Sequence, residues 1–165
     1  MANSPRQTFL DTFERECATT LKVLRAYPED KAEIRPHPRG KSARELAFIF
    51  ALEQGLTLGV LSNSLDMSKG SPPVPDTIAG SIAAFEQGKA KLVEAVKALP
   101  DDKITSGTVK FMVGPKQMGD IPTMDFLWFI LFDQIHHRGQ FSIYLRMADA
   151  MVPSIYGPTA DEPWM

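Results

Sequence analysis

The fold of this chain is decided by residues 126–146, which read FLWFILFDQIHHRGQFSIYLR. Apolar residues recur there every three or four positions, which is the spacing of one face of an α-helix. The stripe that they form also contains polar residues and consists of Phe126, Ile130, Asp133, His137, Phe141 (or Gln140), Tyr144 and Ala148. The opposite side has the composition of a solvated face and carries Gln134, Arg138, Ser142 and Asp149. The pattern predicts an amphipathic helix from Pro122-Thr123 to about Ala150.

Asp133 and His137 are expected to face the interior of the protein from this helix. Residues four apart in sequence lie about 40° apart around a helix axis, so the two side chains share a face, one turn apart. A buried carboxylate without a partner is costly, so Asp133 must meet a cation, a metal ion or hydrogen-bond donors. The imidazole of His137 is one such partner. Any chemistry of this chain is therefore expected around these two residues.

Three further helices and a hairpin are predicted from the rest of the sequence. Ser4-Pro5 is typical of an N-cap followed by proline at the first helical position, and Ser42 to Glu45 has the spacing of a capping box. The expected segments are a helix from Ser4-Pro5 to near Tyr27-Pro28, a second from Ser42 to about Leu65, a third from Asp76 or Thr77 to before Pro100, a small hairpin or extended loop within residues 103–119, and a non-helical strap after Val152. Four helices with one apolar face each most simply form an all-α four-helix bundle.

The length and composition of the chain are those of one soluble domain, residues 1–165. Hydrophobic residues make up 44% and charged residues 23%, which are normal values for a globular protein. A net charge of −2 and a pI near 5.9 leave no basic stripe, which argues against a nucleic-acid or anionic-membrane partner. Charged residues interrupt the N-terminal segment, so we expect no secretory leader and a cytoplasmic location. The longest apolar run, residues 126–132, is too short to span a bilayer.

Four segments of the chain together resemble the DinB superfamily of bacterial proteins. They are residues 42–47 (SARELA), 133–140 (DQIHHRGQ), 144–146 (YLR) and 152–158 (VPSIYGP). The most specific part is HHRGQ with the YLR that follows it. The resemblance implies a four-helix bundle, often a homodimer, with a divalent metal ion such as zinc or nickel held by three histidines, one from helix two and two from helix four. It also implies a small-molecule ligand, since characterised relatives include metal-dependent thiol transferases and a maleylpyruvate isomerase.

The histidine set that the resemblance implies is altered in this chain. His137 matches the second ligand of helix four, whereas Asp133 stands where the first would be a histidine. The helix-two ligand would fall close to Phe48, and no histidine occurs between Ser42 and Leu65. His37 precedes that helix and lies between two prolines, where we expect a loop residue.

Two interpretations of Asp133 and His137 remain open at this point. In the first, they form a modified metal site that a third group or water molecules complete, and the protein is an enzyme of the thiol-transferase type. In the second, they form a structural ion pair in a vestigial site. The protein is then a non-catalytic binding or interaction module, with an apolar pocket that is walled by Phe48 and closed by the pair.

Several other side chains are interpreted as structural. Cys17 is expected to be a core thiol, because it lies on the apolar stripe of the first helix. Gly139 is expected to allow the close approach of another helix. Arg138 is expected in a surface or interface ion pair, although it could join Arg146 in holding an anionic substrate. His136 is expected to face a neighbouring helix or a dimer partner rather than to bind a metal ion.

Overall fold

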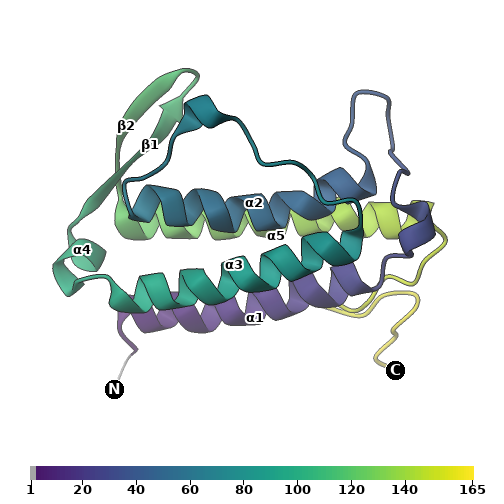
Figure 1. The fold of residues 1–165 in the computed structure, drawn as a ribbon. Coiled ribbons are helices and arrows are strands. Elements are labelled where there is room, and N and C mark those ends of the chain that lie inside the picture. The colour runs from purple at the N-terminus through teal and green to yellow at the C-terminus, as the bar shows by residue number, and fades with distance from the viewer. Residues whose placement is uncertain (1–2) are drawn as a thin grey trace.

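The chain folds into a mostly helical structure in which four long helices lie side by side (Figure 1). The computed structural model describes residues 3–165. The long helices are α1 (Pro5–Arg25), α2 (Ala43–Leu61), α3 (Ile78–Ala98) and α5 (Thr123–Met147). The shorter elements are the 3-10 helices η1 (Glu29–Lys31) and η2 (Met67–Lys69), the helix α4 (Asp101–Thr105), and the strands β1 (Thr108–Gly114) and β2 (Gln117–Pro122). Both α1 and α2 pack against α3 and α5, so the long helices share one core.

The fold class predicted from the sequence needs a correction, because the structure is not purely α-helical. β1 and β2 pair as an antiparallel hairpin that begins with Thr108 opposite Pro122. The hairpin expected between the third and fourth long helices is therefore present. It packs on the first half of α5, where the rings of Phe111 and Phe126 are 5.0 Å apart. The five-residue helix α4, which joins α3 to this hairpin, is too short to show a helical period in sequence.

Side-chain caps fix the beginnings of α1, α2 and α3 where the sequence placed them, whereas α5 begins after Pro122 without a side-chain cap. The hydroxyl of Ser4 accepts from the backbone N–H of Gln7, and Pro5 is the first residue of α1. At α2, the Ser42 hydroxyl accepts from the N–H of Glu45 while the Glu45 carboxylate accepts from the N–H of Ser42. This is a complete capping box. Of the two residues considered for α3, Thr77 is the cap.

The buried arc of α5 is wider than the sequence pattern predicts. The apolar members of the predicted stripe, such as Phe126 and Phe141, are buried as expected. However, Gln134 and Arg138, which were expected on a solvated face, have exposed fractions of 0% and 1%. The reason is that α5 contacts both α1 and α2, so two of its sides are covered. The exposed side of α5 instead carries apolar residues, among them Phe129 and Phe132.

A network of buried polar groups runs through the core on the covered side of α5. The amide of Gln54 on α2 donates to Gln134 across 2.9 Å, and the amide of Gln134 lies 3.5 Å from the hydroxyl of Thr20 on α1. Arg138 donates to a carboxylate oxygen of Glu16 across 2.7 Å. Each of these side chains has at least one partner inside the core, which offsets part of the cost of burying it, although Oε1 of Gln54 has none among the described residues.

The segment after α5 is fastened to this network. It contains no regular helix, as the prolines beyond Val152 predicted, and it passes beside the C-terminal end of α1 in Figure 1. The hydroxyl of Tyr156 donates to the carboxylate of Glu16 across 2.7 Å and accepts from Arg138. The segment is also held at its surface, where Glu162 is 2.7 Å from the ammonium group of Lys22.

Cys17 is a core thiol, as the sequence predicted. Its side chain is fully buried, and burial raises the pKa of the thiol to about 12. The reactive thiolate is therefore absent at neutral pH.

Among the described residues, no helix is both long enough and apolar enough to cross a membrane.

Gly139 does not mediate a close helix contact, so the expected packing role is wrong. It lies on the exposed side of α5, and a Cβ atom built on it would meet nothing within 4 Å. Because glycine in a helix interior costs roughly 1 kcal/mol relative to alanine, G139A is expected to stabilise the protein by about 0.5–1 kcal/mol. Urea unfolding of the variant and the parent measures this. Equal or lower stability of the variant would show that the glycine meets a partner here.

Candidate metal centre

Three potential metal ligands converge where α2 meets α5. Asp133 and His137 lie one turn apart on α5, and Glu53 of α2 lies beside them. Nε2 of His137 is 3.5 Å from Oε1 of Glu53 and 3.8 Å from Oδ2 of Asp133. One donor atom from each residue lies within 4.8 Å of the other two. Two neighbouring helices thus present two carboxylates and one imidazole to the same point.

The three side chains differ in their exposure to solvent. The side chain of Asp133 is 43% exposed and that of His137 is 21% exposed. The prediction that both face a dry interior is therefore wrong for Asp133, because the buried arc of α5 is centred near Gln134 and Asp133 lies just outside its edge. The buried carboxylate of this cluster is that of Glu53, which is 9% exposed.

Glu53 is the member of the cluster that the sequence reasoning did not identify. Its two carboxylate oxygens are buried and have no hydrogen-bond partner among the described residues. Burial, and then the negative charge of Asp133, raises the pKa of Glu53 to about 9. Polar atoms buried in this way are normally paired, and a cation would satisfy both oxygens. The signal in the sequence was the single charge among the apolar positions of this helix.

The imidazole of His137 is oriented by its neighbour on the next turn. Its Nδ1 lies 3.0 Å from the amide oxygen of Gln140, a contact in which Nδ1 donates when it carries the ring proton. The amide nitrogen of Gln140 in turn donates to Nε2 of the exposed His136 across 2.9 Å. The other ring nitrogen of His137, Nε2, faces Glu53 and Asp133. This is the orientation that a metal-binding histidine adopts when a second group holds its other nitrogen.

Phe48 does not occupy the position on α2 that faces this cluster. It is buried on another side of the helix and lines a cavity of about 580 Å³ between α2, α3 and the connection that joins them. Neither Asp133 nor His137 lines that cavity, so the apolar pocket expected to be walled by Phe48 and closed by this pair is not formed. His37 lies in an exposed loop, as predicted, where its Nδ1 accepts from the backbone N–H of Arg39 across 3.1 Å.

The two arginines considered for holding an anionic substrate are both engaged elsewhere. Arg138 is inside the core with Glu16, contrary to the expected surface or interface ion pair. Arg146 lies 2.6 Å from a carboxylate oxygen of Asp161 in the segment after α5. His136 is exposed and contacts Gln140 rather than a neighbouring helix.

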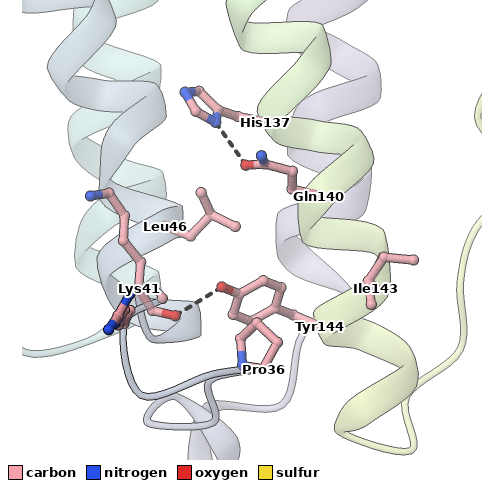
Figure 2. Close-up of a pocket in the computed structure, with 9 residues that line it drawn as sticks. Pro36, Lys41, Leu46, His137, Gln140, Ile143 and Tyr144 are labelled. Atoms are coloured by element: carbon pink, nitrogen blue, oxygen red, sulfur yellow. Dashed lines mark hydrogen bonds between the residues drawn. The ribbon is translucent and has the colours of Figure 1, made fainter.

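An open cavity of about 460 Å³ adjoins the cluster and shares His137 with it. Figure 2 shows Leu46 and Lys41 on one side of this cavity and His137 and Gln140 on the other. The hydroxyl of Tyr144 donates to the backbone carbonyl of Lys41 across 2.8 Å and ties the loop before α2 to α5. The volume lies within the range of small-molecule sites. A ligand in this cavity would lie next to His137.

The donor set of the cluster fits a divalent cation. Oxygen and nitrogen ligands about 2.0–2.2 Å from a metal ion lie roughly 3.0–3.5 Å from one another. The 3.5 and 3.8 Å separations of the His137 nitrogen from the two carboxylate oxygens need only a small closure to reach that spacing. The two buried oxygens of Glu53 lack a partner among the described residues, and a bound cation would displace the proton that burial keeps on this carboxyl.

Three comparisons place this fold and its sequence among known proteins. The chain is 25% identical over 158 residues to the uncharacterized protein YrdA of Bacillus subtilis, a match that covers 93% of this chain and 89% of YrdA. Its structure resembles that of a DinB-like protein from Bacillus cereus, with a TM-score of 0.76, 21% identity, and coverage of 91% of this chain and 97% of that one. A DinB-like protein of Bacillus subtilis, YjoA, matches with a TM-score of 0.70, 14% identity, and coverage of 90% and 97%.

The sequence itself also carries the family pattern almost from end to end. The profile of the DinB family matches residues 1–164, which include the residues that first suggested the resemblance. With the fold and the sequence in agreement, the chain belongs to the DinB family.

Proposed function

We propose that Glu53, Asp133 and His137 hold a divalent metal ion and that the protein is a metal-dependent enzyme of the thiol-transferase type. The observation that carries the metal proposal is the buried carboxyl group of Glu53, whose oxygens have no hydrogen-bond partner among the described residues and which faces Nε2 of His137. A donor set of two carboxylates and one imidazole accepts zinc, and it favours manganese or iron(II) more than three imidazoles would.

The proposed reaction uses the cavity that adjoins the cluster. When bound, a divalent ion supplies a Lewis acid that lowers the pKa of a thiol or a water molecule coordinated to it. His137 and Glu53 would hold the metal ion from two different helices and so fix the position of the thiol or water molecule bound to it. The side chains of the cavity hold the second reactant against it. In thiol transfer to a chloroarene, an S–C bond forms and a C–Cl bond breaks, with loss of a proton and chloride.

Elemental analysis of the untagged protein after loading with zinc, manganese or nickel tests the metal proposal. One ion per chain is expected in the parent protein, and less than a tenth of this in D133A after dialysis. The matched control is D125A, since Asp125 is an exposed aspartate on the same helix. It should retain the full metal content. If no metal binds to the parent, or if D133A and D125A behave alike, the proposal is wrong.

Gln140 provides a second test through its contact with His137. Because its amide oxygen accepts from Nδ1–H of His137, Q140L removes the group that holds the ring orientation. Loss of such an outer hydrogen bond weakens metal binding by roughly 10–100-fold. Titration of the metal-free protein with zinc in the presence of a competing chelator measures the change. Zinc affinity that is unchanged in Q140L would contradict the assigned role of Gln140.

The reaction itself is tested with cysteine as the thiol and 1-chloro-2,4-dinitrobenzene as the acceptor. Product formation above the uncatalysed rate should require the metal ion and should be absent from D133A. A rate that does not differ between metal-loaded and chelated protein would refute the thiol-transferase proposal. The metal site would still be decided by the elemental analysis.

A non-catalytic binding module is the second candidate function. The apolar cavity of about 580 Å³ beside Phe48, which is separate from the metal cluster, favours it. Binding of an apolar fluorescent probe there should be weakened by A51W, since Ala51 lines the cavity. Probe binding combined with the absence of metal would support this candidate over the first.

The homodimer expected from the family resemblance remains a prediction. The exposed apolar residues of α5, such as Phe129 and Ile143, are consistent with it. Sedimentation equilibrium measures the mass directly, and a monomer at tens of micromolar concentration would contradict it.

A further inference from the structure

We infer that the cavity beside His137 binds a small organic acid, with its anionic group at Arg39 and Lys41 and its apolar part against Leu46 and Tyr144. Both cationic residues belong to the loop before α2 and line the cavity. As an assignment of substrate class, this inference rests on the proposed metal centre. As a binding property, it can be measured without the metal.

The charged residues that line the cavity are all cationic. Arg39 and Lys41 line it, whereas no aspartate or glutamate does. Neither cation forms an ion pair within residues 3–165, although several acidic side chains lie near this loop in sequence. Those acids are already engaged: Glu45 caps α2 and lies 3.5 Å from Arg35, and Glu33 lies 2.6 Å from Arg44. Two unneutralised cations at one cavity favour an anionic ligand.

Much of the remaining wall of the cavity is apolar. Leu46, Ile143 and the ring of Tyr144 form much of the wall between the cationic loop and His137. A bare inorganic anion would leave these surfaces in contact with water. An organic anion covers them, and burial of apolar area then adds to its affinity. The ligand is therefore expected to have an apolar body of modest size, in keeping with the volume of about 460 Å³.

The loop that supplies the cations is ordered by contacts of its own. The N–H of Gly40 donates to the carbonyl of His37 across 2.8 Å, and the Tyr144 hydroxyl holds the carbonyl of Lys41. A site that is held in shape before the ligand arrives loses less entropy on binding. Figure 2 shows how this leaves Lys41 and His137 on different sides of one cavity. A ligand held by its anionic end can thus direct its other end toward His137.

Binding of phenylacetate tests the inference, with phenylacetamide as a neutral compound of the same shape. In NMR spectra of the isotope-labelled, metal-free protein, phenylacetate should shift the Gln140 side-chain amide and the Ile143 methyl groups in a saturable way. Phenylacetamide should bind at least tenfold more weakly. Inorganic phosphate, which lacks an apolar body, should give no saturable shift of Ile143. Raising the salt concentration should weaken binding of phenylacetate but not of phenylacetamide.

Removal of the two cations provides the decisive comparison. R39Q/K41Q should lose about tenfold in phenylacetate affinity, while K97Q/K110Q, which removes two exposed lysine charges from α3 and β1, should not change it. A thermal melt confirms that each variant is folded. Equal binding of the acid and the amide, an unchanged R39Q/K41Q, or shifts confined to the cavity beside Phe48 would each overturn the inference.

The failure of this inference can be told apart from failure of the proposed metal centre. D133A is expected to lose metal but to keep its affinity for phenylacetate, whereas R39Q/K41Q is expected to keep metal and lose the acid. A protein that binds metal but shows no preference for the acid would refute the substrate class alone. A protein that prefers the acid but binds no metal would refute the metal centre and leave an anion-binding site.

Discussion

R138M is expected to lower the free energy of unfolding by about 3–5 kcal/mol, because the buried carboxylate of Glu16 then keeps only the exposed Arg15, 3.9 Å away, as a cation. The guanidinium group is 1% exposed and lies 2.7 Å from that carboxylate. It also donates to the backbone carbonyl of Glu16 across 3.0 Å, and this contact would be lost as well. For a chain of this size, the change corresponds to a fall of roughly 10 °C in melting temperature. Urea unfolding and thermal melts of the metal-free protein measure it.

Two further variants separate the buried pair from an ordinary surface contact. E16M/R138M removes both charges, and it should recover much of the lost stability, since apolar replacements of a buried ion pair are often tolerated. R146A removes an arginine that is paired with Asp161 at the surface and should cost less than about 1 kcal/mol. If R138M costs no more than R146A, the pair inside the core has no special role in stability.

E53Q is expected to make the metal-free protein more stable at pH 8 while leaving its stability at pH 4 nearly unchanged. The pKa of Glu53 is about 9 in the folded protein, against a value of 4.5 for a free carboxyl. Below pH 4.5 the group is protonated in both the folded and the unfolded states, so its ionisation does not change the free energy of unfolding. Above that pH the unfolded state releases the proton while the folded state keeps it. Stability then falls by about 1.4 kcal/mol per pH unit until the pH approaches the folded pKa.

Glutamine has the shape of the protonated carboxyl and does not ionise, so E53Q removes this slope. The difference in unfolding free energy between E53Q and the parent isolates the effect, because all other titrating groups are shared. It should grow from pH 5 to pH 8 in the presence of a chelator. A pH-independent difference would mean that Glu53 ionises normally in the folded protein, and its assigned burial would then be wrong.

The sequence predicted what depends on local contacts. Ser4, Ser42 and Thr77 cap their helices through residues three positions away, so short-range spacing was enough to place the starts of α1, α2 and α3. The ends were less accurate. α2 stops at Leu61 rather than near Leu65, because the chain turns into a left-handed conformation at Asn63, with φ of 53°. An asparagine that adopts this conformation is not marked by helical periodicity.

The candidate site was only partly predictable, because it depends on how two helices are rotated against each other. The spacing of Asp133 and His137 on one helix was sufficient to pair them. Which residue of α2 would face them depends on long-range packing, and the family position near Phe48 pointed to the wrong side of that helix. Glu53 could be recognised in the sequence as an unusual charge among apolar positions, but the residues of α5 that it faces could not be identified. Arg138 was misplaced for a related reason, since a polar residue that is paired inside a core has the same sequence pattern as a solvated one.

The contact of Tyr156 with Glu16 and Arg138 has a consequence for how the protein is made. These three residues belong to the first helix, the last helix and the segment that follows it, so the interior is incomplete until that segment has left the ribosome. Assembly of the native state is therefore expected to be post-translational rather than progressive. Truncations after α5 should accordingly give chains that depend on chaperones for their solubility, even though every long helix is present.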